Sequence, residues 1–373
     1  MISGRVKLGE FQHLIEEWLP PATAWKGDNV GLQIGRNEAV VRNILVALDV
    51  TLEVGIEAVR KDANLIVTHH PLFFHPLRSL TSKSRNGEIA LYLAERKINL
   101  YAAHTNLDHA RGGVSFAMAA ALGLRNVRSL SQLDGHLVKM TVNVPSSHLE
   151  AVANAMHQAG GGRFSNYEEV SFRSEGIGTF KGTESSRPFI GSPGVLEKTP
   201  EVKLEMLVER WNVSKVLKAM VSRHPYEEIA YDLVPLENKS SEHGLGAIGE
   251  CQKPMTQEKF LAVVKRTLKV PSLRYTGMNG KSVHKVAVCG GAGFDAAEEA
   301  MRQGADAFVT ADIKYHGFQE VQRDLFLIDA GHYETERHIL PLLASKIREI
   351  AKTRHTSSKV FITQKNTNPV SYY

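Results

Sequence analysis

The segment NILVALDVTLEVGIEAVRKDANLIVTHH, Asn43–His70, recurs later in the chain as KVAVCGGAGFDAAEEAMRQGADAFVTAD, Lys285–Asp312. The two segments align without a gap, and each predicts an apolar strand, a turn, an amphipathic helix and a second apolar strand. Identical residues occur at seven aligned positions, Val46/Val288, Glu57/Glu299, Ala58/Ala300, Arg60/Arg302, Ala63/Ala305, Val67/Val309 and Thr68/Thr310. Parallel strands joined by helices bring their C-terminal ends to one edge of a sheet, where open α/β folds bind ligands. We therefore predict an α/β fold with two pseudo-symmetric halves that form one core domain.

Metal-binding residue types follow the strands of both copies. They are His69 and His70, then His104 and Asp108, in the first copy, and Asp312, then His332 and Glu336, in the second. A His pair or a His-x-x-x-Glu motif alone is more often an ordinary polar surface, but unrelated surface residues have no reason to fall at equivalent strand ends. We predict a metal site with His69, His70, Asp108, His332 and Glu336 as candidate ligands. Nitrogen and oxygen ligands without thiolate suit Zn, Fe(II) or Mn(II).

The His69-His70-Pro71 motif favours two ions over one. Proline disfavours helical geometry for the residue before it, and adjacent residues on an extended chain point to opposite sides. We expect His69 and His70 to serve different ions of a two-metal centre, as in hydrolases whose ions lie about 3.5–4 Å apart.

Three further polar residues have open roles. His104 is the repeat counterpart of His332, and is either a ligand or a residue that orients one through a hydrogen bond. Asp312 corresponds to His70 and is expected to orient a ligand or a water molecule. His316 is a candidate acid/base residue or a structural one, so we take His104 and His316 as the candidate catalytic residues.

Other motifs have both functional and structural interpretations. The glycine-rich Cys289–Gly293 is either a phosphate cradle or a tight strand-to-helix turn. In the loop Trp25–Gly31, Asp28 and Asn29 either line the pocket or belong to a plain connection with Trp25 in the core. For His224–Glu228 we favour a structural turn.

The chain between the two copies predicts a separate domain. We expect residues 1–131 and 241–373 to form the two halves of the core and residues 132–240 to be inserted. The insert predicts strands at 135–144, 202–208 and 229–235 and helices at 148–159 and 213–223, with a glycine- and serine-rich passage between. This pattern is typical of a ferredoxin-like α+β domain, with two helices on one face of an antiparallel sheet.

Composition sets outer limits on function. The chain has 373 residues, 43% hydrophobic residues and a net charge of +5, with Lys and Arg scattered rather than clustered. This charge mildly favours an anionic partner and gives no support for nucleic-acid binding by itself. Cys251 and Cys289 lack metal-site spacing, so we expect both to be buried and the protein to be cytoplasmic, without a membrane span.

Six motifs in combination resemble one protein family, the GTP cyclohydrolase 1 type 2 homologues, also called Ngg1-interacting-factor-three-like proteins. The motifs are Trp25–Leu32, Thr68–Leu72, His104–Asp108, Gly290–Gly293, Thr310–His316 and Asp329–Glu336. The chain is similar to the longer bacterial members, which carry an inserted domain resembling the PII and CutA proteins. The resemblance implies a dinuclear metal site with the five ligands named above, in a hexameric toroid. It also implies one ion held by His70, Asp108 and Glu336, and the other by His69, His332 and Glu336.

Three hypotheses of function remain open. The first is a dinuclear metal-dependent hydrolase acting on a nucleotide, for which the resemblance implies opening of the purine ring of GTP, with His104 or His316 moving protons. The second is a metal-binding or metal-delivery protein. The third is a regulatory ring that binds protein or nucleic acid. Five ligands for two ions leave coordination positions open, which favours chemistry over a structural role.

Overall fold

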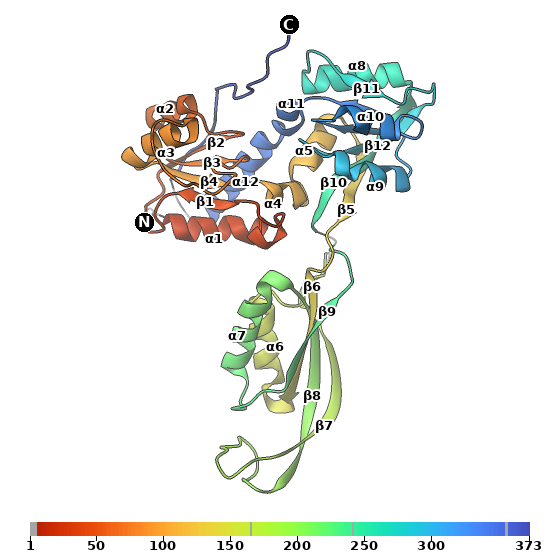
Figure 1. Cartoon of the computed structure of the whole chain (residues 1–373). Coiled ribbons are helices and arrows are strands. Elements are labelled where there is room, and N and C mark those ends of the chain that lie inside the picture. Colours follow the sequence, from red (N-terminus) through yellow and green to blue (C-terminus); the bar gives the residue numbers. More distant parts are fainter. Residues whose placement is uncertain (1–5, 165, 241, 355–356) are drawn as a thin grey trace. The chain divides into compact units, whose positions relative to one another are not determined.

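The computed structural model describes residues 6–164, 166–240, 242–354 and 357–373 (Figure 1). The chain divides into two compact units, residues 1–131 with 243–373, and residues 132–242. The sequence puts the corresponding boundaries at 131/132 and 240/241. The larger unit contains both copies of the repeat and two mixed sheets.

The first sheet has the strand order β1-β4-β3-β2-β15, in which only β1 runs antiparallel to its neighbour. Its strands are β1 (Gly31–Ile34), β2 (Asn43–Ala47), β3 (Ala63–Thr68), β4 (Asn99–Ala102) and β15 (Val360–Ile362). Every residue of β3 is buried. A continuously apolar strand of this kind is typical of a parallel sheet that is covered on both faces.

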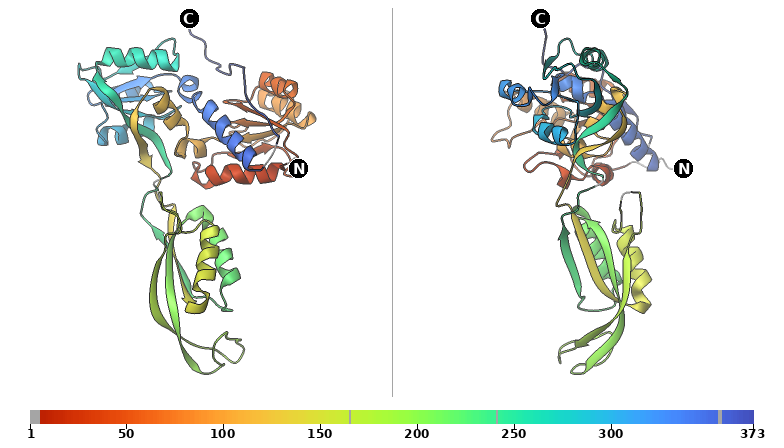
Figure 2. Two further views of the ribbon diagram at one scale, coloured as in Figure 1. Left: turned by 180° about the vertical axis from the view of Figure 1, so that it is seen from behind. Right: turned by 90° about the vertical axis from the view of Figure 1, so that its right-hand side faces the viewer.

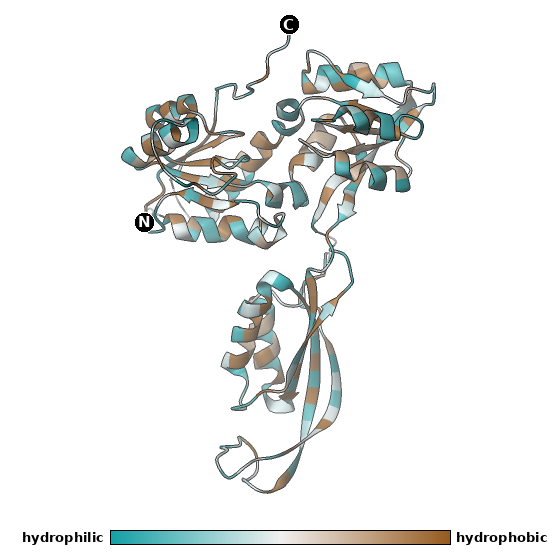
Figure 3. Ribbon diagram, in the orientation of Figure 1, coloured by the Kyte–Doolittle hydropathy of each residue, from teal (hydrophilic) through white to brown (hydrophobic). Residues whose placement is uncertain are grey.

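Four helices provide that cover, α1 (Leu8–Trp18), α2 (Leu52–Arg60), α3 (Arg85–Glu95) and α12 (Ile339–Thr353). Successive residues of a strand face opposite sides. Accordingly, Ile44 packs with Phe11 of α1 and Leu343 of α12, whereas Leu45 packs with Val54 of α2. The apolar sides of the strands and helices are brown in Figure 3.

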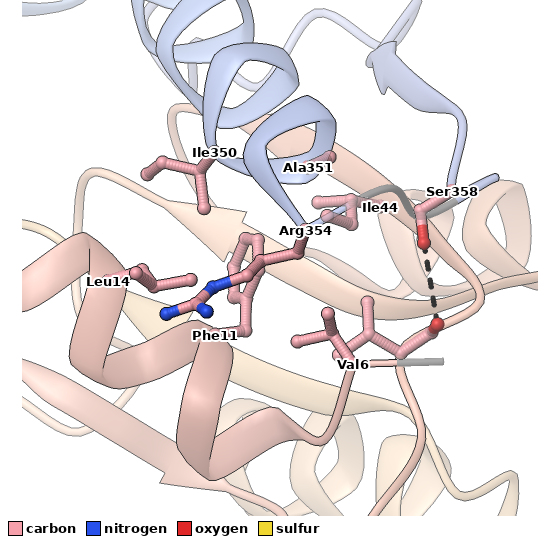
Figure 4. Close-up of a pocket in the computed structure, with 9 residues that line it drawn as sticks. Val6, Phe11, Leu14, Ile44, Ile350, Ala351, Arg354 and Ser358 are labelled. Carbon is pink, nitrogen blue, oxygen red and sulfur yellow. Dashed lines mark hydrogen bonds between the residues drawn. The ribbon is translucent and has the colours of Figure 1, made fainter. Parts of the chain in front are cut away.

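A small hollow remains where α1 packs against α12 (Figure 4). It is lined by Phe11, Leu14 and Ile350, and Arg354 extends across it to bring its Nε 3.4 Å from Glu10. Its volume of about 10 Å³ is no more than one water molecule requires. The hollow is therefore a feature of core packing and not a ligand site.

The second sheet has the order β11-β14-β13-β12-β10-β5, with β12, β13 and β14 parallel. Its strands are β5 (Arg125–Gln132), β10 (Gly244–Met255), β11 (Arg274–Thr276), β12 (Val283–Val288), β13 (Ala307–Thr310) and β14 (Phe326–Asp329). Helices α5 (Val114–Ala121) and α8 (Gln257–Leu268) pack on one face, and α9 (Ala297–Arg302) and α10 (Tyr315–Val321) on the other. Cys251 and Cys289 are buried in these two layers, which confirms the expectation for both.

The repeat gives the two sheets the same central topology, β4-β3-β2 in one and β14-β13-β12 in the other. The connecting helices differ at their start. Thr51 caps α2 by accepting a hydrogen bond from the Val54 amide, whereas the aligned Gly293 has no side chain to cap α9. A 3₁₀ turn, Phe294–Ala296, precedes the shorter α9.

The second unit is an antiparallel sheet of order β7-β8-β6-β9 with two helices on one face (Figures 1 and 2). Its elements are β6 (Leu137–Pro145), α6 (Leu149–Gln158), β7 (Phe172–Lys181), β8 (Leu196–Glu209), α7 (Val213–Arg223) and β9 (Tyr231–Leu236). The structure differs from the sequence-based prediction in two strands: part of the glycine-rich passage forms β7, and β8 begins well before residue 202. Most side chains of β7 are exposed, so the strand lacks the alternation that identifies a half-buried strand.

None of the described helices combines the length and the apolar character needed to cross a bilayer.

Candidate metal centre

The candidate ligands lie just beyond the C-terminal ends of parallel strands. His69 and His70 follow β3, and Asp108 lies in α4 (Thr105–His109), which follows β4. His332 begins α11 (His332–Glu336), the short helix after β14, and Glu336 ends it. A spacing of four residues brings the last two side chains to one helical face.

Four imidazoles of this region have the same arrangement of hydrogen bonds. Each Nδ1 is paired with an oxygen: His69 with Ala103 O at 2.8 Å, His70 with Asp49 at 2.8 Å, His104 with Asp28 at 2.9 Å, and His332 with Asp312 at 2.6 Å. A carboxylate or carbonyl on one ring nitrogen fixes the tautomer that leaves the other nitrogen free for a metal ion. This arrangement is typical of metal-ligating histidines.

Glu336 lies among the Nε2 atoms of His69, His70 and His332. Its Oε1 is 3.6 Å from His69 Nε2 and 3.2 Å from His332 Nε2, and its Oε2 is 3.0 Å from His70 Nε2. Asp108 Oδ1 lies 3.7 Å from His69 Nε2. The structure thus brings together all five ligands predicted from the sequence.

The ligand sets that the family resemblance implies, His70 with Asp108 and His69 with His332, stay a prediction. Glu336 Oε1 lies near both His69 Nε2 and His332 Nε2, and Oε2 lies near His70 Nε2, which is compatible with those sets. Two other contacts run between the sets: His69 Nε2 is 3.7 Å from Asp108 Oδ1, and His70 Nε2 is 3.3 Å from His332 Nε2. Where β3 ends, the amides of both histidines donate to Leu48 O.

Among the described residues, two groupings satisfy the distance requirement for a shared ion. One consists of His70, His332 and Glu336, and the other of His69, His70 and His104; within each, one ligand atom per residue lies within 4.8 Å of the others. Because His70 belongs to both groups, the assignment of His69 and His70 to separate ions stays a prediction.

Buried atoms without hydrogen-bond partners support a cation at this position. His69 Nε2 and Glu336 Oε2 are buried and make no hydrogen bond; the 3.0 Å approach of His70 to Oε2 lacks hydrogen-bond alignment. A buried polar atom left unsatisfied costs about 1–3 kcal/mol. Coordination of a metal ion would satisfy both atoms, so the residues present fit a metal site.

Electrostatics favour positive charge at the same place. Burial by itself would lower the pKa of His70, but its hydrogen bond to Asp49 and the nearby Glu336 carboxylate raise the pKa to about 10. Burial would also lower the pKa of His332, but Asp312 and Glu336 raise it to about 11. Burial would raise the pKa of Glu336, but the surrounding imidazoles, His69 foremost, hold it well below its usual value. The cluster therefore attracts positive charge, whether protons or metal ions supply it.

The loop before β1 belongs to the site through Asp28. The Asp28 carboxylate accepts hydrogen bonds from His104 Nδ1 and from the hydroxyl of Thr105, and these outweigh burial to lower its pKa to about 2. Asn29 instead donates to Phe73 O. Trp25 is 51% exposed, so the alternative in which it belongs to the core is wrong.

The other predicted residues have different outcomes. Asp312 accepts a hydrogen bond from His332, as expected of an orienting residue, and its backbone is left-handed, with φ 54°. His316 is exposed on α10 with its ring against Tyr315, and across the described parts of the chain it belongs to neither metal-binding group. Its acid/base role stays a prediction.

The glycine-rich loop is a tight turn and not an open phosphate cradle. The amides of Gly290, Gly291 and Gly293 already donate to the hydroxyls of Ser115, Thr335 and Thr310. Gly291 has a second function, because a Cβ on it would lie 2.2 Å from Glu336 Oε1. The glycine therefore makes room for the central carboxylate.

Asp49 is a site residue that the sequence reasoning missed. Its carboxylate pairs with His70 Nδ1 and accepts a hydrogen bond from the hydroxyl of Thr367. Its position just after β2, at the same sheet edge as His69 and His70, is the signal that could have identified it.

Comparisons with known proteins show which family the chain resembles. The sequence model of the family described as Duf34/NIF3 (NGG1p interacting factor 3) matches residues 6–369. Proteins named GTP cyclohydrolase 1 type 2 homolog, from Halalkalibacterium halodurans and Bacillus subtilis, are 39% and 37% identical over 361 residues, 96% of this chain and 97% and 96% of theirs. The crystal structure of a Bacillus cereus protein related to NIF3 has a TM-score of 0.88 and 38% identity, with 100% of both chains covered.

Proposed function

Because the chain belongs to the Duf34/NIF3 family, we propose that it is a metal-dependent hydrolase with a dinuclear centre built around Glu336. One observation carries the proposal: three imidazoles, those of His69, His70 and His332, are each held at Nδ1 and present Nε2 to the buried carboxylate of Glu336. A group of this kind made only for stability would leave no buried atom without a partner.

The five proposed ligands are His69, His70, Asp108, His332 and Glu336, with Zn, Fe(II) or Mn(II) as candidate ions. Two such ions, when bound, supply Lewis-acid polarisation of a substrate and acidify water. Because Glu336 has a histidine Nε2 near each of its two oxygens, it is the residue suited to bridge the ions.

His104 is the proposed acid/base residue. Its Nδ1 is paired with Asp28, which leaves Nε2 for proton transfer, and its ring lies beside those of His69 and His70, with centroids 5.3 and 5.6 Å away. A carboxylate behind an imidazole holds the ring and stabilises its protonated form. Asp28 therefore positions His104 for proton transfer.

We propose a purine nucleotide as the substrate, with opening of its ring as the reaction. The support is the name that the relatives carry, GTP cyclohydrolase 1 type 2 homolog. The alternatives, metal delivery and a regulatory ring without turnover, use the same ligands and predict binding without product.

The experiment is turnover of a panel of nucleotides by metal-loaded protein, with ring-opened product and released phosphate measured separately. We expect Glu336→Gln to abolish turnover and His104→Gln to lower it while the metal content stays near that of the unaltered protein. Glu334→Gln, the same change two residues away in α11, is the matched control. Full metal occupancy with no turnover of any nucleotide would favour the delivery or regulatory alternative.

Two further proposals concern architecture. The chain order β6-α6-β7-β8-α7-β9 and the sheet order β7-β8-β6-β9 support a ferredoxin-like, PII- or CutA-like identity for the second unit. The family resemblance leads us to propose a homohexameric ring in the cytoplasm, which light scattering of the purified protein and cell fractionation test.

A further inference from the structure

The second unit contains a cavity of about 430 Å³ that the metal chemistry does not use. Sites for small molecules usually have volumes of about 300–1,000 Å³. Strand β7, the loop that joins it to β8, and the segment after α7 supply most of its lining. All of its lining residues belong to residues 132–242, so the cavity is complete within one unit.

Glu201 of β8 is the buried polar group of this cavity. It is only 9% exposed, and its Oε1 accepts a hydrogen bond of 2.7 Å from the hydroxyl of Tyr226. Among the described residues, no hydrogen bond reaches Oε2. Oε2 is not among the fully buried atoms that lack a partner, so it is accessible and can accept a charge-assisted hydrogen bond from a molecule in the cavity.

Glycine in β7 leaves room for that carboxylate. A Cβ on Gly178 would lie 2.2 Å from Glu201 Oε2. Glycine weakens a strand and often marks a place where another group approaches the backbone closely. The Glu201 carboxylate therefore lies against Gly178, and a side chain at this position would displace it.

Aromatic rings and negative charge complete the lining. Phe180 and Phe189 lie with ring centroids 6.1 and 6.3 Å from that of Tyr226, and Phe189 is 52% exposed. Aromatic faces attract cations. The charged residues of the lining are three carboxylates, Glu201, Glu227 and Glu228, and one cation, Lys181, so the cavity has a negative balance.

From these features we infer that the cavity binds a small organic cation that has N–H donors and an apolar body, such as a primary amine or an amidinium compound. The cationic head donates to Glu201 Oε2, and the body packs on Phe180, Phe189 and Tyr226. A quaternary ammonium lacks the donor that the carboxylate requires, and the negative balance disfavours anions. His224–Glu228, for which the sequence favours a structural turn, also supplies part of this site.

The test is a titration of the full-length protein with benzamidine, with its neutral analogue benzamide and with benzyltrimethylammonium, a cation without N–H donors. Affinities come from calorimetry, and NMR of the aromatic side chains locates the binding. We expect benzamidine to bind at least about tenfold more tightly than either analogue, the effect of one charge-assisted hydrogen bond. Equal affinities for the three compounds, or no binding of benzamidine at millimolar concentration, would overturn the inference.

Three variants locate the site. Glu201→Gln keeps an acceptor for Tyr226 and removes the charge, so benzamidine should bind no better than benzamide. Glu205→Gln, the same change on the same face of β8 but outside the cavity lining, should leave binding unaltered. Gly178→Ala should lower benzamidine affinity without any change of charge, which keeps the test valid if Glu201→Gln fails to fold. Unchanged binding in both Glu201→Gln and Gly178→Ala would refute the site.

Discussion

The two copies of the repeat have the same strand order and contribute opposite chemistry to the site. In the first copy the histidine, His70, follows β3, and the carboxylate that holds it, Asp49, follows β2. In the second copy the carboxylate, Asp312, follows β13, and the histidine, His332, follows β14. The backbone of an α/β repeat thus provides equivalent strand ends, and the side chains at those ends determine which one binds and which one orients.

The copies also differ in the space that they leave for the central carboxylate, Glu336. The residue aligned with Asp49 is Gly291, and the absence of a side chain there leaves room for Glu336. The first copy supplies three imidazoles, and the second supplies one imidazole and the central carboxylate. A centre of this kind requires the copies to diverge, since two identical copies would place the same side chains at both sets of strand ends.

Removal of Glu336 should have the largest effect, because its carboxylate lies close to imidazoles from both copies. We expect Glu336→Gln to lower metal affinity by more than the roughly 10–100-fold loss that follows removal of an orienting residue. Metal analysis after dialysis should show both ions depleted. Full occupancy by two ions in this variant would show that the copies bind their ions independently.

Gly291→Ala tests whether the glycine is needed for space rather than for its backbone conformation. Gly291 and Gly304 both have positive φ, 63° and 70°, but only Gly291 would bring a Cβ against Glu336, while Gly304 faces open space. The conformational cost should be about 1 kcal/mol in both variants. Urea unfolding and metal analysis should show that Gly291→Ala alone loses metal as well. Equal losses of metal and of stability in the two variants would contradict the idea that Gly291 is needed to leave space for Glu336.

Loss of an orienting carboxylate should have a smaller and similar effect in the two copies. Asp49→Asn and Asp312→Asn each remove the charge behind one of two neighbouring imidazoles, His70 and His332, so each should weaken metal binding by about tenfold. Competition with a chelator measures the change. Asp62→Asn, an exposed position in the first copy, is the control. An effect in only one of the two variants would mean that one copy holds the metal alone.

The smallest effect should come from a change at His224 in the second unit, and it concerns how stability depends on pH. The pKa of His224 is lowered, whereas the pKa values of His70 and His332 are raised. Burial lowers the pKa of His224. Its contacts suit a neutral ring, because Nδ1 accepts a hydrogen bond from the Tyr226 amide while Nε2 donates one to Asn143 O. A histidine with a lowered folded-state pKa contributes stability above its unfolded pKa of about 6.5 and loses that contribution as the pH falls toward the folded value.

Urea unfolding followed by the fluorescence of Trp211 checks this prediction. The second unit should be less stable at pH 5 than at pH 7.5, and His224→Gln should reduce the difference. A pH dependence that is unchanged in His224→Gln would assign it to other groups.

Much of this arrangement follows from sequence because it depends on local pattern. The apolar runs at Asn43–Ala47 and Ala63–Thr68, and the helix between them, have the periodicity of a buried parallel unit, and the repeat shows it twice. The same logic placed the five candidate ligands at strand ends, and the structure brings them together. Strand β7 was not predicted, because its mostly exposed side chains lack that pattern.

Sequence by itself determined which residues stand at the C-terminal edges of the two sheets, since chain direction and strand order follow from the repeat. Only the tertiary structure decided which of them meet. His70 and His332 are 262 residues apart, and their 3.3 Å approach depends on how the two halves pack and how the chain turns after β3. The contacts of Asp49 with His70 and of His69 with Asp108 likewise depend on the tertiary structure, because such contacts require ångström-scale positions that no local periodicity encodes.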